Sequence, residues 1–472
     1  MNKLMLGTFS GIFLLLGMVI IYYWRDIQYD PSALDLVSYF FILPVLVSLI
    51  LLAPYFIYQA YPAYIRRREQ RNRALLEQQQ LNKAYTDKEP KVEEIKWFNL
   101  NVFSAFACHA FGENETIIEG LENFKTPGLD YHLENSYGLP VLSYRIQKLD
   151  HILELADDEQ NEEDEAGRVV RIKALIQQQL EQQTEILSQV AEHLKQSALF
   201  YDSELAYQYR MHSAWSTLDA PTNDQDDQDI SIEQVPRLNR LNIHFLLSDN
   251  LLQVWDEHLT QEIVLHFIES LGILSQQIHL QPHYIAQQNA YTYWLKLLEK
   301  ISAQSDQFSL LINVDSEIDQ TLLDEKMWLK DDYLAAEFSS SWCVAAADVK
   351  INNIEAIKIV KVASNVDDLA ICLNQAIPRL TKQIQQEQPF VLVLDDVTDI
   401  KSIKKNNQKF APALIEPYHF LYTKLMLGHT QHLAKIFGFM LGMHLPDEMT
   451  AMIYSSDQVS SYAFFQTNIA EN

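Results

Sequence analysis

Two long apolar runs open the chain, and shorter apolar segments recur behind them. Residues 4–23 and 37–58 each give roughly 20 consecutive, mainly apolar positions, the length that a helix needs to cross a bilayer. Tyrosine and tryptophan gather at the ends of these runs, as they do at membrane interfaces. No small-residue cleavage site follows the first run. The pattern therefore predicts a transmembrane hairpin over residues 1–64 rather than a removed signal peptide.

An arginine cluster directly after the second run predicts the orientation of this hairpin. Five of the eight residues from 66 to 73 are arginine, namely Arg66, Arg67, Arg68, Arg71 and Arg73. By the positive-inside rule, both termini and everything after residue 64 lie in the cytoplasm. The alternative is a cationic helix start without topological meaning. Residues 65–96 are predicted to form a basic helix and a charged linker that contains Pro90.

From residue 97 onward, strand-like and helix-like periods alternate. The strand-like segments are 97–108, 139–146, 240–247, 275–281, 308–315, 354–362, 389–396 and 451–454. The segments with helical spacing are 113–124, 168–200, 250–274, 290–302, 317–329 and 366–385. This order predicts one α/β domain over residues 97–472, with helices on both faces of a sheet. The long helical insertion 168–200 has an apolar stripe that either packs on the domain or forms a coiled coil with a partner.

Composition changes the picture mainly through charge. The chain has 472 residues, is 48% hydrophobic and carries a formal net charge of −27. Such an acidic chain is not expected to bind nucleic acid, because phosphate binding needs clustered lysine and arginine. A basic protein partner is compatible with it, although acidic cytoplasmic proteins are common. The acidic loops 157–165 and 217–233 are candidate contact surfaces.

The three cysteines, Cys108, Cys343 and Cys372, stand far apart in apolar segments. No CxxC pair occurs, so neither a disulfide framework nor a zinc site is predicted. The sequence also lacks a glycine-rich phosphate loop, HExxH and an EF-hand pattern. We therefore expect no cofactor and no metal.

A turn near the C-terminus is the main candidate for chemistry. Gly428, His429 and Thr430 precede an apolar segment that carries Lys435 and is too short to span a bilayer. A glycine turn at a helix start exposes backbone N–H groups, and an imidazole beside them makes a place for an oxyanion or a carbonyl. The alternative is a core helix with a hydrogen-bonded histidine.

An enzyme hypothesis needs further side chains around this turn. Asp395 and Asp396 follow a buried strand, at the carboxyl end where open α/β sheets place their sites. In that hypothesis Cys343 is the nucleophile, His429 or His432 is the base, and one of the aspartates orients the base. The spacing of these residues gives the hypothesis no support of its own.

The order of motifs from residue 308 to residue 454 resembles the second half of ketoacyl synthases in the thiolase-like superfold. Leu-Leu-Ile-Asn-Val-Asp315 is followed by a helix, then Ala345-Ala-Ala-Asp-Val, then Val-Leu-Val-Leu-Asp-Asp396, then Gly-His-Thr430. The chain departs from that family in its reactive parts. It has no central Cys-Ser-Ser elbow and no His-Gly-Thr-Gly-Thr segment.

Leu-Asn-Val-Phe103, Gly-Glu-Asn-Glu-Thr-Ile-Ile-Glu119 and Gly-Leu-Pro-Val-Leu142 lie in the first part of the domain. With the Gly-His-Thr helix start, these segments resemble the type VI secretion lipase-adaptor family, which joins a membrane segment to a degenerate thiolase-like domain. That resemblance implies a layered α/β/α thiolase-like domain behind two transmembrane helices. It further implies a non-enzymatic adaptor at the bacterial inner membrane that recruits an effector, such as a phospholipase, or a component of the secretion apparatus. The alternatives are a thiolase-like acyl-transfer enzyme with a rearranged site, and a membrane scaffold that acts through its hairpin.

Overall fold

The computed structural model describes residues 16, 18–27, 43, 94–157, 167–215, 234–286, 289–329, 333–395, 400–424 and 433–468. The chain divides into two units, Met1–Glu93 and Glu94–Asn472. In the first unit the structure describes a helical segment at residues 18–27, together with the single helical residues 16 and 43. No helix among the described residues is both long and apolar enough to cross a membrane. The predicted hairpin, the arginine cluster and the linker lie almost entirely outside these residues, so they stay predictions.

A mixed β-sheet runs through the second unit. Its strands follow the order β11-β10-β12-β13-β9-β1-β8-β7-β5-β6. The first half contains β1 (Lys96–His109), β5 (Arg240–Ser248), β6 (Ile278–Ile285), β7 (Gln307–Ser316) and β8 (Ala335–Ala346). The second half contains β9 (Lys358–Ser364), β10 (Val391–Val393), β11 (Phe420–Tyr422), β12 (Ala451–Tyr454) and β13 (Tyr462–Thr467).

The two halves of the sheet repeat one plan. In the first half β6, β5 and β7 are parallel, and β8 and β1 follow as antiparallel neighbours. In the second half β11, β10 and β12 are parallel, and β13 and β9 follow in the same way. The first strand of each half, β1 and β9, pair with each other antiparallel. The domain is therefore internally duplicated.

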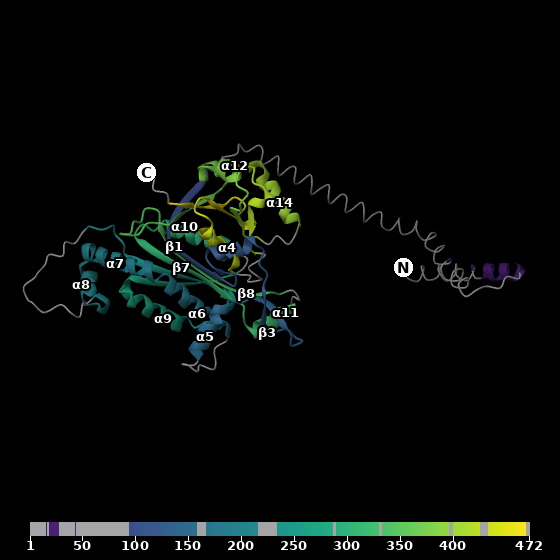
Figure 1. The fold of residues 1–472 in the computed structure, drawn as a ribbon, viewed down its shortest axis with the longest axis horizontal. Helices are drawn as coiled ribbons and strands as arrows, with labels where there is room; N and C mark the ends of the chain where they lie inside the picture. The colour runs from purple at the N-terminus through teal and green to yellow at the C-terminus, as the bar shows by residue number, and fades with distance from the viewer. Residues whose placement is uncertain are drawn as a thin grey trace, which may run out of the picture. The chain divides into compact units, whose positions relative to one another are not determined.

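Helices cover the half-sheets in layers (Figure 1). The outer layer on the first half holds α5 (Gln147–Asp157), α6 (Gly167–Gln182), α7 (Thr184–Tyr201) and α9 (Glu257–Ser270). The middle layer holds α4 (Glu115–Glu122), α10 (Ala290–Ser302) and α15 (Ala434–Met440), which share one core with strands of both halves. The outer layer on the second half holds α12 (Leu369–Ala376), α13 (Leu380–Ile384) and α14 (Ile400–Phe410).

Smaller elements sit on this frame. The hairpin of β3 (Gly128–Glu134) and β4 (Pro140–Tyr144) joins β8 through a short parallel pairing. The two-residue strand β2 (Gly112–Glu113) extends β1, and α8 (Ser203–Met211) follows α7. Helix α11 (Gln320–Leu329) precedes β8. The expected layered α/β domain is confirmed.

The long helical insertion expected over 168–200 is divided into two helices, because the chain turns at Gln183 between α6 and α7. The Gln183 N–H bonds to the carbonyl three residues back, and its buried side chain donates to Ser341 Oγ at 2.8 Å. The turn brings the side-chain amide of Gln183 to the hydroxyl group of Ser341, a buried polar group of β8 that would otherwise need another partner. The apolar stripe of both helices belongs to the core, as one of the two interpretations expected.

The middle layer is packed closely enough to require a glycine. A Cβ added to Gly438 in α15 would lie 2.6 Å from Thr423 Oγ1 and 3.1 Å from Leu394 Cδ2. Gly128, at the start of β3, has nothing within 4 Å of the same position. The backbone of Gly438 is not in a left-handed conformation, so glycine is required at this position for steric reasons.

We predict that Gly438→Ala lowers the free energy of unfolding by about 1–3 kcal/mol, as overpacked core sites do. The matched Gly128→Ala should change it by less than about 0.5 kcal/mol, as surface changes do. Urea unfolding of both variants tests this. Equal stability of the two variants would show that the contact between α15 and the sheet is looser than described.

Candidate functional site

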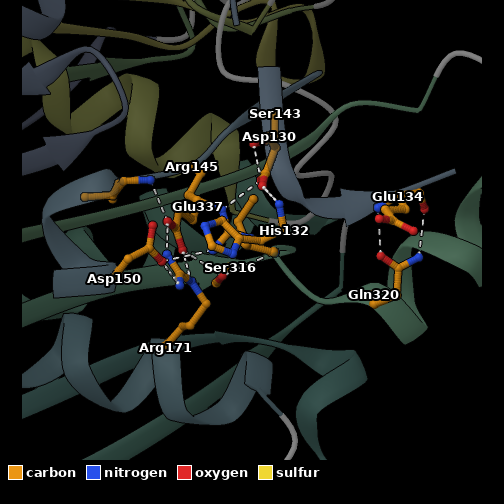
Figure 2. Close-up of polar contacts among 12 residues, drawn as sticks. Asp130, His132, Glu134, Ser143, Arg145, Asp150, Arg171, Ser316, Gln320 and Glu337 are labelled. Atoms are coloured by element: carbon orange, nitrogen blue, oxygen red, sulfur yellow. Dashed lines mark hydrogen bonds and ion pairs between the residues drawn. The ribbon is translucent and has the colours of Figure 1, made fainter. Parts of the chain in front are cut away.

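Five charged side chains join the hairpin β3–β4 to the sheet through α5 and α6 (Figure 2). Arg145 donates to Asp130 Oδ2 at 2.7 Å through Nε and to Asp150 Oδ1 at 2.9 Å through Nη1. Arg171 donates to the same Asp150 oxygen. It also donates to Glu337 through Nε and Nη2, at 2.8 and 2.6 Å. We call these five residues the charge chain; each cation in it lies between two anions.

Glu337 is the buried end of the charge chain. It lies in β8 and has no exposed surface. Besides the two bonds from Arg171, its carboxylate accepts from the Ile146 N–H at 2.6 Å and from Ser316 Oγ at 3.0 Å. A buried carboxylate is tolerated only when its charge and its lone pairs are satisfied, and four donors meet that requirement.

At its other end the charge chain lines a pocket of about 810 Å³ through Asp130, Arg145 and Asp150, which we call the floor of the pocket. The walls come from the end of β1, from residues 124–132 and from residues 143–150. This volume lies within the range of small-molecule sites. Phe124, Leu129 and Tyr131 line the pocket and are strongly exposed, at 74%, 49% and 75%. The site thus combines a polar floor with an apolar rim.

His109 is among the residues that line this pocket, and its ring also contacts Phe437 of the middle layer. It lies at the end of β1, is 2% exposed, and its ring packs against Phe111 and Tyr144. Burial lowers the pKa of His109 to about 3, so the imidazole is neutral near pH 7. Its Nδ1 accepts from the Phe111 N–H at 3.3 Å, so the proton is on Nε2. Within the described residues this Nε2–H has no hydrogen-bond partner.

The cysteine beside His109 is not a nucleophile in this environment. Cys108 lines the same pocket but is 1% exposed, and burial raises the pKa of its thiol to about 12. Burial also raises the pKa of Cys372 to about 12, in the second half of the domain. A thiol with such a pKa is protonated near neutral pH, and the reactive form is the thiolate.

The enzyme hypothesis built on Cys343 is not supported by the geometry. Cys343 is fully buried in β8, between β1 and β7, and its Sγ donates to Gln183 Oε1 at 3.4 Å. Burial raises the pKa of this thiol as well. The side chain belongs to the core under α6 and α7, on the face of the sheet opposite the middle layer. It is a structural thiol.

Asp395 lies elsewhere, after β10. It accepts from Lys435 Nζ and from Ser455 Oγ, each at 3.0 Å, and from the Ser456 N–H. These bonds tie α15 to the ends of β10 and β12. The structure does not bring Asp395 together with Cys343. Gly428, His429 and Thr430 lie outside the described residues, as do Asp396 and His432, so the predicted turn stays a prediction.

Sequence reasoning missed the residues that the structure joins at this site. Arg171 stood inside a helical stripe, and Glu337 stood in a segment to which no strand was assigned. A charged residue between Ala336 and Phe338 was the available signal. A glutamate inside an apolar run is seldom buried without a cationic partner. The partner, 166 positions away, is not visible in the sequence.

A second buried carboxyl cluster lies at the ends of β7 and β8. Arg168 Nη2 donates to Asp315 Oδ1 at 2.8 Å, and Tyr333 Oη donates to Glu317 Oε2 at 2.6 Å. Burial, and then the charge of Asp315, raise the pKa of Glu317 to about 8, against the smaller opposing effect of Tyr333. The carboxyl group of Glu317 therefore holds its proton near neutral pH.

No protein-family model matches the chain, and no curated protein matches it. Solved structures do match it, at low sequence identity. The ishigamide ketosynthase/chain length factor is 10% identical, with a TM-score of 0.39 over 78% of this chain and 98% of that one. A mutant form of the ketosynthase from module 6 of the bacillaene synthase from Bacillus subtilis 168 is 8% identical, with a TM-score of 0.41 over 79% and 71%. A β-ketoacyl synthase from Burkholderia phymatum STM815 is 9% identical, with a TM-score of 0.38 over 79% and 100%.

The expectation of a non-enzymatic type VI secretion adaptor is corrected by this comparison. The similar structures are ketosynthases, and nothing in the comparisons points to secretion. The coarser expectation of a layered α/β domain holds, because the described part of the chain forms a mixed sheet covered by helices. At identities of 8–10%, the similarity to the ketosynthases concerns the fold and not their activity.

We predict that Arg171→Met costs about 3–5 kcal/mol of folding free energy, because it leaves buried Glu337 without its cation. Lys148→Met is the matched control. Lys148 pairs with Glu113 at 2.9 Å, but its side chain is 74% exposed. Removing that surface pair should cost less than about 1 kcal/mol. Chemical denaturation of both variants tests the contrast; a loss below about 1 kcal/mol for Arg171→Met contradicts it.

The Glu317 cluster predicts a pH dependence of stability. The folded pKa of about 8 lies above the ordinary 4.5, so the folded state holds a proton that the unfolded state releases between these values. Its contribution is complete below about pH 4.5 and is lost as the pH rises to about 8. Glu317→Gln should therefore flatten the fall in unfolding free energy between pH 5 and pH 8. The exposed Glu325→Gln should leave that fall unchanged, and an unchanged fall in both variants refutes the assignment.

Proposed function

We propose that this chain binds an acyl ligand in the pocket between β3, β4 and α5, and that His109 polarises the carbonyl group of the ligand. The observation that carries the proposal is the buried Nε2–H of His109, a donor without a protein partner among the described residues, at a ligand-sized pocket. A buried donor is costly when it is left unpaired, so a site that holds one is suited to an acceptor supplied by a ligand.

The charge balance of the pocket favours an uncharged acceptor over a carboxylate. Six lining side chains are charged, three of each sign: Lys125, Arg145, Lys148, Glu113, Asp130 and Asp150. Both carboxylates of the floor are already occupied by Arg145. A carbonyl oxygen gains from the neutral imidazole N–H without adding a charge to this balance.

The apolar rim supports an acyl chain on that carbonyl. Phe124, Leu129 and Tyr131 expose large apolar surfaces at the pocket. Covering them with a hydrocarbon chain contributes about 25 cal/mol per Å² of apolar surface removed from water. A ligand with a carbonyl near His109 and a chain along this rim satisfies both parts of the site.

The chemistry that we propose for His109 is electrophilic. A neutral imidazole that donates from Nε2 stabilises negative charge that develops on a carbonyl oxygen. Because burial keeps the thiols of Cys108 and Cys372 protonated, with a pKa of about 12 each, we propose no covalent step on either sulfur. The conclusion is a thiolase-like acyl-binding domain whose candidate reactive group is an imidazole N–H.

The test compares two ligands and two variants by calorimetry. His109→Phe keeps an aromatic ring but removes the N–H, and should weaken binding of an octanoyl thioester of N-acetylcysteamine about tenfold. The corresponding thioether, which lacks the carbonyl oxygen, should bind both proteins equally. His258→Phe, a change at an exposed position in α9, should affect neither ligand.

The carbonyl stretch of the bound thioester gives a second reading. With a ¹³C-labelled carbonyl, hydrogen bonding to His109 lowers the infrared frequency, and His109→Phe should return it to the solution value. Failure of the wild-type protein to bind the thioester, or equal loss of thioester and thioether in His109→Phe, overturns the proposal.

A further inference from the structure

The edge of the β3–β4 hairpin is held by side chains instead of by another strand. Strand β3 pairs with β4 alone, so within the described residues its other edge has no strand beside it. At Glu134 the backbone N–H donates to Gln320 Oε1 at 2.9 Å, and the backbone C=O accepts from Gln320 Nε2 at 2.8 Å (Figure 2). The primary amide of Gln320 therefore makes the two bonds that the peptide group of a neighbouring strand would make.

A second backbone group on β3 is satisfied in a similar way. The N–H of His132 donates to Asp130 Oδ1 at 2.9 Å, within the same strand. Side-chain amides and carboxylates at an edge keep its backbone groups paired without a permanent neighbour. Such bonds can be exchanged for main-chain bonds when an extended segment arrives.

We propose that this edge accepts an extended, basic peptide segment of a partner protein, which replaces the Gln320 amide and pairs with β3. The chemistry around the edge selects the occupant. Glu134 is exposed on β3, Asp319 directly precedes α11, and Asp324 and Glu325 lie within it. Lys326 is the single cation of that helix. Charge complementarity therefore favours lysine or arginine on the incoming strand.

Aromatic side chains near the edge strengthen this choice. Tyr131 and Tyr137 on the hairpin are 75% and 85% exposed, and Trp328 at the end of α11 is 91% exposed. Exposed aromatic faces attract ammonium and guanidinium groups as well as apolar side chains. An alternating sequence of basic and β-branched residues fits an edge with acidic and aromatic neighbours. The chain as a whole, at −27, adds long-range attraction for such a segment.

The direct test uses an eight-residue peptide of alternating arginine and valine, with fluorescence anisotropy as the readout. If Gln320 competes for the edge, Gln320→Ala should bind this peptide about fivefold more tightly than the wild type, because two hydrogen bonds no longer have to be broken first. Gln177→Ala is the matched control. Gln177 is also an exposed helical glutamine that bonds an acidic residue four positions on, as Gln320 does with Asp324.

Two further peptides separate strand pairing from simple charge attraction. N-methylation of alternate residues keeps every side chain but removes backbone donors, and should abolish binding. The alternating glutamate and valine peptide should not bind. In the wild-type protein, the amide NMR signal of Glu134 should shift on addition of the basic peptide. Absence of binding by the basic peptide overturns the inference, and so does unchanged affinity in Gln320→Ala or undiminished binding of the methylated peptide.

Discussion

The buried pair of Arg171 and Glu337 is the constraint on which the first half of the domain depends. Glu337 stands in the strand that borders β1 on one side and β7 on the other, so a charge there is far from water. Its cation comes from α6, and the next link, Asp150, comes from α5. The outer helices, the sheet and the β3–β4 hairpin are consequently held in one arrangement by side chains that cannot be exchanged singly.

The pocket is a consequence of that arrangement. Asp130 and Asp150 are fixed by Arg145, so the hairpin stands at a set distance from the end of β1, and the space between them remains open. Hydrophobic packing alone would favour closing such a space around His109. The duplicated second half has no hairpin of this kind among its described elements, which explains why the two halves, equal in strand order, are unequal in their surfaces.

Much of the fold follows from local pattern. The strands β1, β5, β7 and β12 and the helix α10 agree with their predicted segments because each has the full apolar period of its element.

The break at Gln183 was not visible in the sequence, because helix propensity continues through it and the deciding contact is with Ser341. No strand was predicted at β8 for a related reason: its serines interrupt the apolar pattern, and their partners, Gln179 in α6 and Gln183 in the turn after it, are far away in sequence. The candidate site was least accessible, because every contact in the charge chain joins separate elements, and its partners at Arg171 and Glu337 are far apart in sequence. The resemblance to known families predicted the layered architecture correctly, but its prediction of a non-enzymatic secretion adaptor was wrong.

The central claim is that His109 presents a neutral Nε2–H to an acyl ligand. The most direct measurement is the ¹⁵N NMR spectrum of histidine-labelled protein, from pH 4.5 to 8, with and without the octanoyl thioester. The account predicts a His109 ring in the Nε2–H tautomer throughout this range, since its pKa lies near 3, and a shift of Nε2 when the thioester binds. A His109 that titrates near its ordinary pKa of about 6.5, or an Nε2 signal that ignores the ligand, would contradict it.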